Sequence, residues 1–224
     1  MRVVLFGATG MVGQGVLGEC LKDAAVSQVV CVGRTPLGLA HPKCREVVAP
    51  DLFELGPFED QLRGLDACFF CLGVSSNGLS EASYRRLTYD LTLSVASRLA
   101  RLNPALTFVY VSGTGTDSSE RGGVMWARVK GATENALLRL PFKSAFMFRP
   151  GIIVPLDGIR SKTPSYRFFY SALGPVLRGL QRLMPRSMNT TRSIGRAMLA
   201  VARHGAPSPL LGPAEIEAAA AKNR

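Results

Sequence analysis

The sequence has few of the residues that metal sites and disulfide frameworks need. Its 224 residues include only two histidines, His41 and His204, and five cysteines. The usual ligand clusters for a transition metal cannot be assembled from this set, so we expect no metal site. An odd number of cysteines in a chain without a secretory signal indicates reduced thiols. Cys68 and Cys71 resemble a C-x-x-C pair, but in a hydrophobic strand they point to opposite faces, which favours packing.

Long apolar runs and disordered composition are also missing. No apolar run reaches the roughly 18 to 20 residues that a membrane-spanning helix needs. The N-terminal stretch is apolar but has no basic region of any length, unlike a signal peptide. We therefore expect a cytoplasmic protein without a transmembrane segment. Apolar residues make up 47% of the chain and charged residues only 19%, which predicts one folded domain with a sizeable core over residues 1–224.

Acidic residues are scarce in the second half of the chain. Residues 121–224 contain 17 of the 27 lysines and arginines but only 4 of the 16 acidic residues, and the net charge is +11. This asymmetry could favour an anionic ligand, a nucleic acid or a membrane surface. A solvated, arginine-rich face explains it equally well. We do not expect a nucleic-acid partner.

The N-terminus carries a pattern typical of phosphate binding. Residues 2–6 form a buried-strand run that leads through G-A-T-G-M-V-G at residues 7–13 into an apolar helical pattern. Glycines allow a tight turn, a close approach of the backbone to a pyrophosphate, and close packing of the helix on the strand. The helix N-terminus directs free N–H groups at the phosphates. The residues expected to hold the pyrophosphate are Gly7, Thr9, Gly10, Met11, Val12 and Gly13.

Residues after the next strands complete the predicted nucleotide site. Arg34 lies 21 residues beyond Gly13, where an acidic residue would bind a ribose 2′-OH and an arginine suits a 2′-phosphate. This favours NADP over NAD. Asp51 stands at a strand end, where it could bind the adenine or serve in a turn or N-cap. Leu72 and Gly73 follow the fourth strand and are expected to run along the riboses.

Strands and helices alternate along most of the chain. Strands are predicted at residues 2–6, 28–32, 45–49, 67–72, 107–111 and 144–148, and helices at 11–22, 58–62, 80–102, 124–139 and 191–203. This alternation predicts an α/β fold in which helices cover both faces of a parallel sheet. The alanine-rich end from Glu215 is expected to fray.

These elements resemble the short-chain dehydrogenase/reductase superfamily in its atypical, epimerase-like branch. The resemblance covers residues 1 to about 155 and rests on residues 7–13, V-G-R at 32–34, V-Y-V-S at 109–112, Lys130, and F-R-P-G at 148–151. Bacterial proteins labelled nucleoside-diphosphate-sugar epimerases and Tat-interacting-protein-like oxidoreductases are the most similar. The resemblance implies a Rossmann-like, doubly wound parallel sheet of six or seven strands, a small C-terminal helical cap, and NADP bound across the C-terminal edge of the strands.

The chemistry of this superfamily uses a Tyr-x-x-x-Lys pair and a serine. Lysine binds the nicotinamide ribose and lowers the pKa of the tyrosine, which exchanges a proton with the substrate oxygen. Lys130 and Ser112 match the pattern, and Ser112 would position a substrate carbonyl or hydroxyl. Trp126 stands where the tyrosine is expected, and an indole does not ionise at any relevant pH.

The resemblance therefore predicts an NADP-dependent oxidoreductase or epimerase-like enzyme that acts on a small carbonyl or hydroxyl substrate, with its acid/base group left open. Tyr89, Tyr166, or a water held by Ser112 and Thr114 could move the proton. The hydride acceptor could be a flavin or quinone-like ring that stacks on Trp126 and needs no protein acid. Alternatively, the chain could be a catalytically silent NADP-binding regulator that acts through a protein partner.

The segment at residues 155–190 interrupts the strand and helix alternation. It is basic and aromatic, and part of it is amphipathic. We expect it to cap the substrate cleft as an insertion within the single domain. An interface in a homodimer or a membrane surface would suit the same amphipathic pattern.

Overall fold

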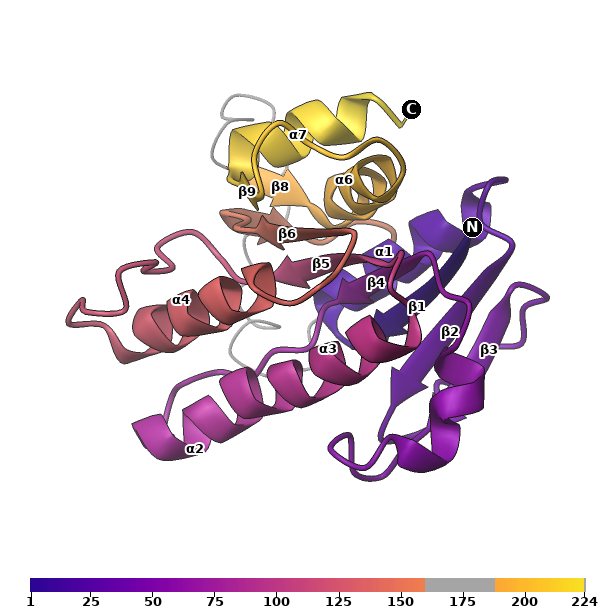
Figure 1. The fold of residues 1–224 in the computed structure, drawn as a ribbon. Helices are drawn as coiled ribbons and strands as arrows, with labels where there is room; N and C mark the ends of the chain where they lie inside the picture. The colour runs from indigo at the N-terminus through magenta and orange to yellow at the C-terminus, as the bar shows by residue number, and fades with distance from the viewer. Residues whose placement is uncertain (160–187, 224) are drawn as a thin grey trace.

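A computed structural model describes residues 1–159 and 188–223 (Figure 1). Its central sheet has seven parallel strands in the order β3-β2-β1-β4-β5-β6-β9. The strands are β1 (Arg2–Phe6), β2 (Gln28–Gly33), β3 (Cys44–Val48), β4 (Ala67–Phe70), β5 (Thr107–Val111), β6 (Ser144–Phe148) and β9 (Leu210–Leu211). The first six follow the doubly wound order of Rossmann folds. The predicted fold class is therefore confirmed.

Helices cover both faces of the sheet, because strand residues alternate between two apolar clusters (Figure 1). Val3 and Leu5 pack under α1 (Met11–Lys22), α6 (Thr191–His204) and α7 (Pro213–Ala221). The other face, with Val4 and Phe6, lies under α3 (Leu91–Leu102), α4 (Met125–Leu138) and the short helix η1 (Gly56–Leu62). Alternation along buried strands produces these two layers.

The two cysteines of the C-x-x-C pattern lie on opposite faces of the sheet, as the alternation predicts. Cys68 is in the cluster under α3 and α4, whereas Cys71 packs against the cluster under α1 and α6. All five cysteines are free thiols.

The helix predicted over residues 80–102 is one continuous run with a π turn in its middle. It comprises α2 (Glu81–Arg85), the π-helical η2 (Arg86–Asp90) and α3. Ser80 caps its N-terminus, where its Oγ accepts a hydrogen bond of 3.2 Å from the Ser83 amide. Such π turns are frequent near functional sites.

The C-terminal part packs tightly on α1. A Cβ on Gly15 would lie 2.5 Å from the Thr191 carbonyl oxygen, so only glycine permits this crossing of α1 and α6. Thr190 and Ser193 form a capping box at the start of α6. The strands β7 (Ile152–Val154) and β8 (Met188–Thr190) pair in parallel beside the main sheet.

The expectation of a frayed C-terminus is wrong. Residues 213–221 form α7, in which Ile216 and Ala220 are buried. Alanine is the best helix former, and burial of Ile216 anchors the helix to the core. The Glu217 carboxylate also accepts hydrogen bonds from Asn189 (2.9 Å) and Ser193 (2.5 Å).

Most of the segment predicted to cap the cleft, residues 160–187, lies outside the described residues. Its role as an insertion in a single domain stays a prediction. Among the described helices, none has the length and apolar character to span a membrane.

Candidate functional site

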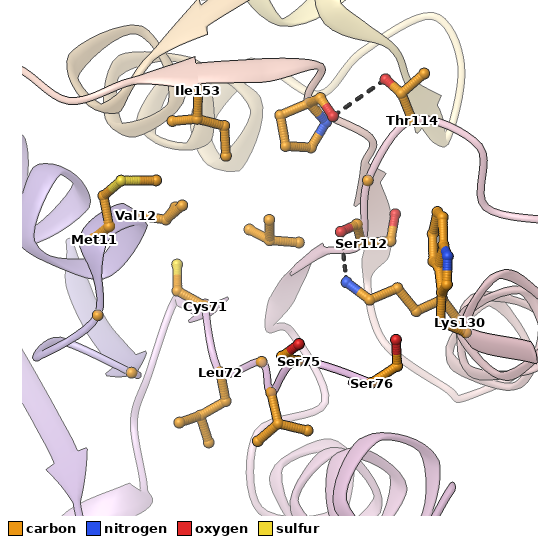
Figure 2. A pocket seen from close by; sticks show the side chains of 18 of the residues that line it. Met11, Val12, Cys71, Leu72, Ser75, Ser76, Ser112, Thr114, Lys130 and Ile153 are labelled. Atoms are coloured by element: carbon orange, nitrogen blue, oxygen red, sulfur yellow. Dashed lines mark hydrogen bonds between the residues drawn. The ribbon is translucent and has the colours of Figure 1, made fainter. Parts of the chain in front are cut away.

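A cavity of about 1250 Å³ opens at the carboxyl ends of the central strands (Figure 2). Its walls come from the turn after β1, the loops after β4 and β5, and the segment between β6 and β7. Figure 2 shows Met11 and Val12 on one side of the cavity and Ser112 and Lys130 on the other. Ligands of doubly wound sheets bind at this edge.

The glycines of the first turn are required by close backbone contacts. Gly7 has a φ of +85°, and a Cβ there would lie 2.8 Å from the Cys71 carbonyl oxygen. A Cβ on Gly13 would lie 2.0 Å from the Gly7 carbonyl oxygen. Gly13 thus lets α1 approach the turn itself, and this approach sets the direction of the helix.

The N-terminus of α1 is open toward the cavity. Its N-cap residue is Gly10, no side chain caps it, and its first turn contains no acidic residue. The Gly10 amide donates to the Gly7 carbonyl (2.9 Å) and closes the turn. The amides of Met11 and Val12, which line the cavity at the positive end of the helix dipole, are therefore the ones placed to bind an anion, whereas Gly13 is buried and lines neither cavity. The chain's own geometry fits a pyrophosphate here.

A smaller cavity of about 420 Å³ continues from this turn over β2 and β3. Thr9, Arg34 and Leu72 line both cavities. Arg34 is exposed at the end of β2. The Glu46 carboxylate fixes the loop that follows, because it accepts hydrogen bonds from the amides of Leu37 (2.9 Å) and Leu39 (3.2 Å).

Asp51 does not line either cavity, although its neighbour Leu52 lines the smaller one. The Asp51 Oδ1 accepts a hydrogen bond of 2.9 Å from the Phe53 amide. The structure therefore places this carboxylate in the turn, which is the alternative that the sequence left open. Leu72 and Gly73, predicted to run along the riboses, both line the larger cavity.

Trp126 and Lys130 lie one turn apart on α4, and both line the larger cavity. Lys130 Nζ donates a hydrogen bond of 2.6 Å to the Ser112 carbonyl oxygen. Burial lowers the pKa of Lys130 to about 8, and the nearby Glu134 partly opposes this shift. A Cβ on Gly115 would lie 3.4 Å from Trp126 Cη2, so the indole packs beside this glycine.

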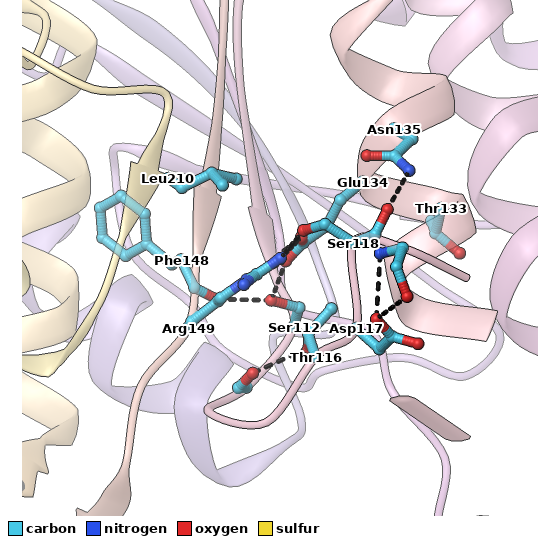
Figure 3. A network of polar contacts seen from close by, with 12 residues as sticks. Ser112, Thr116, Asp117, Ser118, Thr133, Glu134, Asn135, Phe148, Arg149 and Leu210 are labelled. Atoms are coloured by element: carbon cyan, nitrogen blue, oxygen red, sulfur yellow. Dashed lines mark hydrogen bonds and ion pairs between the residues drawn. The ribbon is translucent and has the colours of Figure 1, made fainter. Parts of the chain in front are cut away.

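The Ser112 side chain belongs to a buried polar network (Figure 3). Its Oγ donates to Glu134 Oε1 at 2.5 Å. The fully buried Glu134 also forms an ion pair with Arg149, whose guanidinium donates to Ser118 Oγ at 2.5 Å. Ser112 lines the cavity, but its hydroxyl is directed at two buried acceptors, Glu134 Oε1 and the Phe148 carbonyl oxygen at 3.1 Å.

Glu134 and Arg149 were not predicted from the sequence as site residues. Glu134 lies four residues after Lys130 on the same helix face, which is the one signal that could have indicated it. Arg149 belongs to F-R-P-G at residues 148–151, which contributed to the family resemblance but gave Arg149 no predicted role.

The tyrosines considered as proton donors lie elsewhere. Tyr89 does not line the cavity, and its ring lies 4.1 Å from the Arg85 guanidinium carbon. Tyr166 is outside the described residues. Tyr84, which the sequence analysis did not single out, lines the cavity, but it is buried and burial raises its pKa. Thr114 Oγ1 lies 3.1 Å from the carbonyl oxygens of Arg149 and Pro150.

The strand order and the uncapped helix N-terminus at the cavity define a Rossmann-like, doubly wound α/β fold. Solved structures share this fold. MoeE5, in complex with UDP-glucose and NAD, has a TM-score of 0.67 and 19% identity, covering 95% of this chain and 75% of that one. WbmF from Bordetella bronchiseptica, in complex with NAD⁺, has a TM-score of 0.67 and 16% identity, covering 99% and 77%.

Two curated proteins are similar to this chain in sequence. HTATIP2 of Rattus norvegicus is 28% identical over 154 residues, which is 68% of this chain and 62% of that protein. The protein fmp52-2, mitochondrial, of Aspergillus terreus is 27% identical over 201 residues, covering 89% and 85%. The predicted resemblance to Tat-interacting-protein-like proteins is thus confirmed. No family model matches the chain.

The cytoplasmic location expected from the sequence is contradicted by these relatives, since several are named as mitochondrial proteins. The expectation relied on the absence of a recognisable signal peptide, which does not distinguish between intracellular compartments.

In the described part of the chain, no group of three potential metal ligands occurs.

Proposed function

We propose that this chain binds NADP and acts as an oxidoreductase or epimerase-like enzyme on a small carbonyl or hydroxyl substrate. The observation that carries the proposal is the uncapped N-terminus of α1, which opens into a cavity lined by Arg34, Trp126 and Lys130. Two structural neighbours, MoeE5 and WbmF, are complexes with NAD, which supports a nicotinamide dinucleotide. When bound, such a cofactor supplies or accepts a hydride.

The pyrophosphate, the 2′-phosphate and the riboses each have chain residues to hold them. The amides of Met11 and Val12 would bind the pyrophosphate, together with the turn from Gly7 through Thr9 and Gly10, and Gly13 would keep the helix close to this turn. The Arg34 guanidinium would bind the 2′-phosphate. Lys130, as an ammonium ion, would donate hydrogen bonds to the nicotinamide ribose. Leu72 and Gly73 would support the riboses.

Arg34→Ala is expected to weaken NADPH binding by about 10- to 100-fold, because a hydrogen bond to a charged group contributes about 1.5–3 kcal/mol. NADH affinity should change little, since NADH has no 2′-phosphate. Titration of the fluorescence of Trp126, the one tryptophan of the chain, measures both affinities.

Arg45→Ala is the matched control, because Arg45 is also exposed beside this region but lines neither cavity. It should leave both affinities unchanged. Equal losses of NADPH and NADH affinity in Arg34→Ala would contradict the role of Arg34 in selecting NADP.

NADPH affinity should fall as the pH rises through about 8, the pKa to which burial lowers Lys130. Above that pH the ammonium ion becomes a neutral amine, a weaker donor to the ribose hydroxyls. Isothermal titration calorimetry across pH 6–9 would measure the change. Lys130→Met should bind NADPH weakly with no step near this pH, whereas Lys143→Met, at an exposed lysine, should keep the wild-type profile.

A silent NADP-binding regulator is the second candidate. It is favoured by Trp126 at the tyrosine position and by the commitment of the Ser112 hydroxyl to Glu134. NADPH binding without turnover of any carbonyl or quinone would support this candidate over the enzyme.

A further inference from the structure

The larger cavity has aliphatic as well as polar walls. Val74 and Ile152 line it and are 41% and 49% exposed, so two aliphatic side chains face solvent where it opens. Val111 and Ile153 also line the cavity, and Figure 2 shows Ile153 beside Val12. Among the described lining residues there is no carboxylate. The lining therefore offers apolar surface to a ligand and no negative charge.

Both side chains that would hold a substrate oxygen are unsuited to that task in this chain. Trp126 has an N–H donor but no ionisable group. The Ser112 hydroxyl donates at 2.5 Å to the buried Glu134 carboxylate, away from the cavity. The Lys130 ammonium ion also lines the cavity, but it donates to the Ser112 carbonyl oxygen at 2.6 Å and is assigned to the nicotinamide ribose. An alkoxide formed from an ordinary ketone would thus lack a dedicated general acid, which contributes typically 10²–10⁴-fold to such reactions.

The indole of Trp126 offers a flat aromatic surface in the lining of the larger cavity. Its ring packs beside Gly115, where a Cβ would lie 3.4 Å from Cη2 of the indole. The N-terminal turn of α4 fixes its backbone, and Lys130 follows one turn later. Aromatic rings stack on an indole with a gain of about 0.5–1.5 kcal/mol beyond area burial.

We propose that the substrate is a quinone whose ring stacks on Trp126; this inference rests on the proposed NADP-dependent redox function. The overall reaction is NADPH + H⁺ + quinone → NADP⁺ + hydroquinone. The quinone gains a hydride, which carries two electrons, and a single proton, the H⁺ of this equation, which comes from the solvent. The hydroquinone anion spreads its charge over an aromatic ring and is phenol-like, with a pKa of about 10. It needs no side chain to protonate it within the site.

The first test compares two carbonyl compounds as substrates. Oxidation of NADPH, followed by its absorbance, is measured with menadione and with cyclohexanone. We expect kcat/KM for menadione to exceed that for cyclohexanone by about 100-fold or more, the size of the missing acid contribution. Equal or better turnover of cyclohexanone would overturn the proposal.

The second test measures binding without turnover. Menadione is added to the protein loaded with NADP⁺, and quenching of the Trp126 fluorescence should be saturable. Quenching that rises linearly without saturation would indicate collisions only and would overturn the inference. Calorimetry with NADPH alone separates the two proposals: no NADPH binding overturns the proposed function together with this inference, whereas NADPH binding without saturable quenching overturns the quinone alone.

Variants of Trp126 identify the stacking surface. Trp126→Ala should raise KM for menadione by about 10-fold, the equivalent of about 1.4 kcal/mol of lost stacking and burial. Trp126→Phe keeps a ring and should stay within about threefold of wild type. Leu138→Ala, at an exposed apolar residue of the same helix outside the cavity, should match wild type. An unchanged KM in Trp126→Ala would contradict stacking, provided that its thermal unfolding shows a folded protein.

Discussion

Arg149→Ala is expected to lower the free energy of unfolding by about 3–5 kcal/mol, because it leaves a buried charge without its partner. Glu134 is fully buried, and its carboxylate is paired with the Arg149 guanidinium. The remaining hydrogen bond from Ser112 Oγ does not neutralise the charge. Urea-induced unfolding, followed by circular dichroism, would measure the loss.

A second substitution distinguishes this electrostatic cause from simple loss of packing. The double variant with Arg149→Ala and Glu134→Gln should be more stable than Arg149→Ala alone, since a neutral amide is cheaper to bury and its oxygen still accepts from Ser112. A double variant that is less stable than the single one would contradict the explanation.

Arg128→Ala is the matched control on the same helix. Arg128 pairs with Glu81 at 2.8 Å, but that carboxylate side chain is 53% exposed. Water solvates it when its partner is lost, and exposed pairs contribute about 0–1 kcal/mol. The contrast between the two arginines would show that the stability depends on the burial of Glu134.

The sequence predicted the sheet because its central strands are nearly continuous apolar runs. Val3 to Phe6 are fully buried on both faces. An apolar run of this length, followed by a glycine turn and a helix, is compatible with few structures other than a buried parallel strand. The strands β7, β8 and β9 have three, three and two residues. Strands of that length exist through pairing with distant residues, which no local pattern records.

The candidate site also contains residues that a local sequence pattern predicts and residues that it does not. Gly7 and Gly13 were found because their spacing between strand and helix has a backbone reason. The network of Ser112, Glu134 and Arg149 was not found, since it joins a strand end, a helix and another strand end. A glutamate in a helical pattern is normally exposed, and only the packed structure shows that this one is not.

Gly13→Ala is expected to reduce NADPH affinity by about 100-fold or more. Its methyl group would lie 2.0 Å from the Gly7 carbonyl oxygen, so either the turn or the start of α1 must move. Both carry the amides proposed to bind the pyrophosphate. Loss of two hydrogen bonds to a charged group, at about 1.5–3 kcal/mol each, accounts for this drop. Calorimetry with NADPH would measure it.

Gly18→Ala is the control on the same helix, because nothing lies within 4 Å of a Cβ at that position. Alanine is favoured over glycine in a helix by about 1 kcal/mol, so this variant should be slightly more stable than wild type and should bind NADPH normally. Gly13→Ala should instead lose about 1–3 kcal/mol of stability through the clash. If Gly13→Ala retained full NADPH affinity, the pyrophosphate could not depend on the close approach of α1 to the Gly7 turn, and the proposed cofactor site would have to be placed elsewhere.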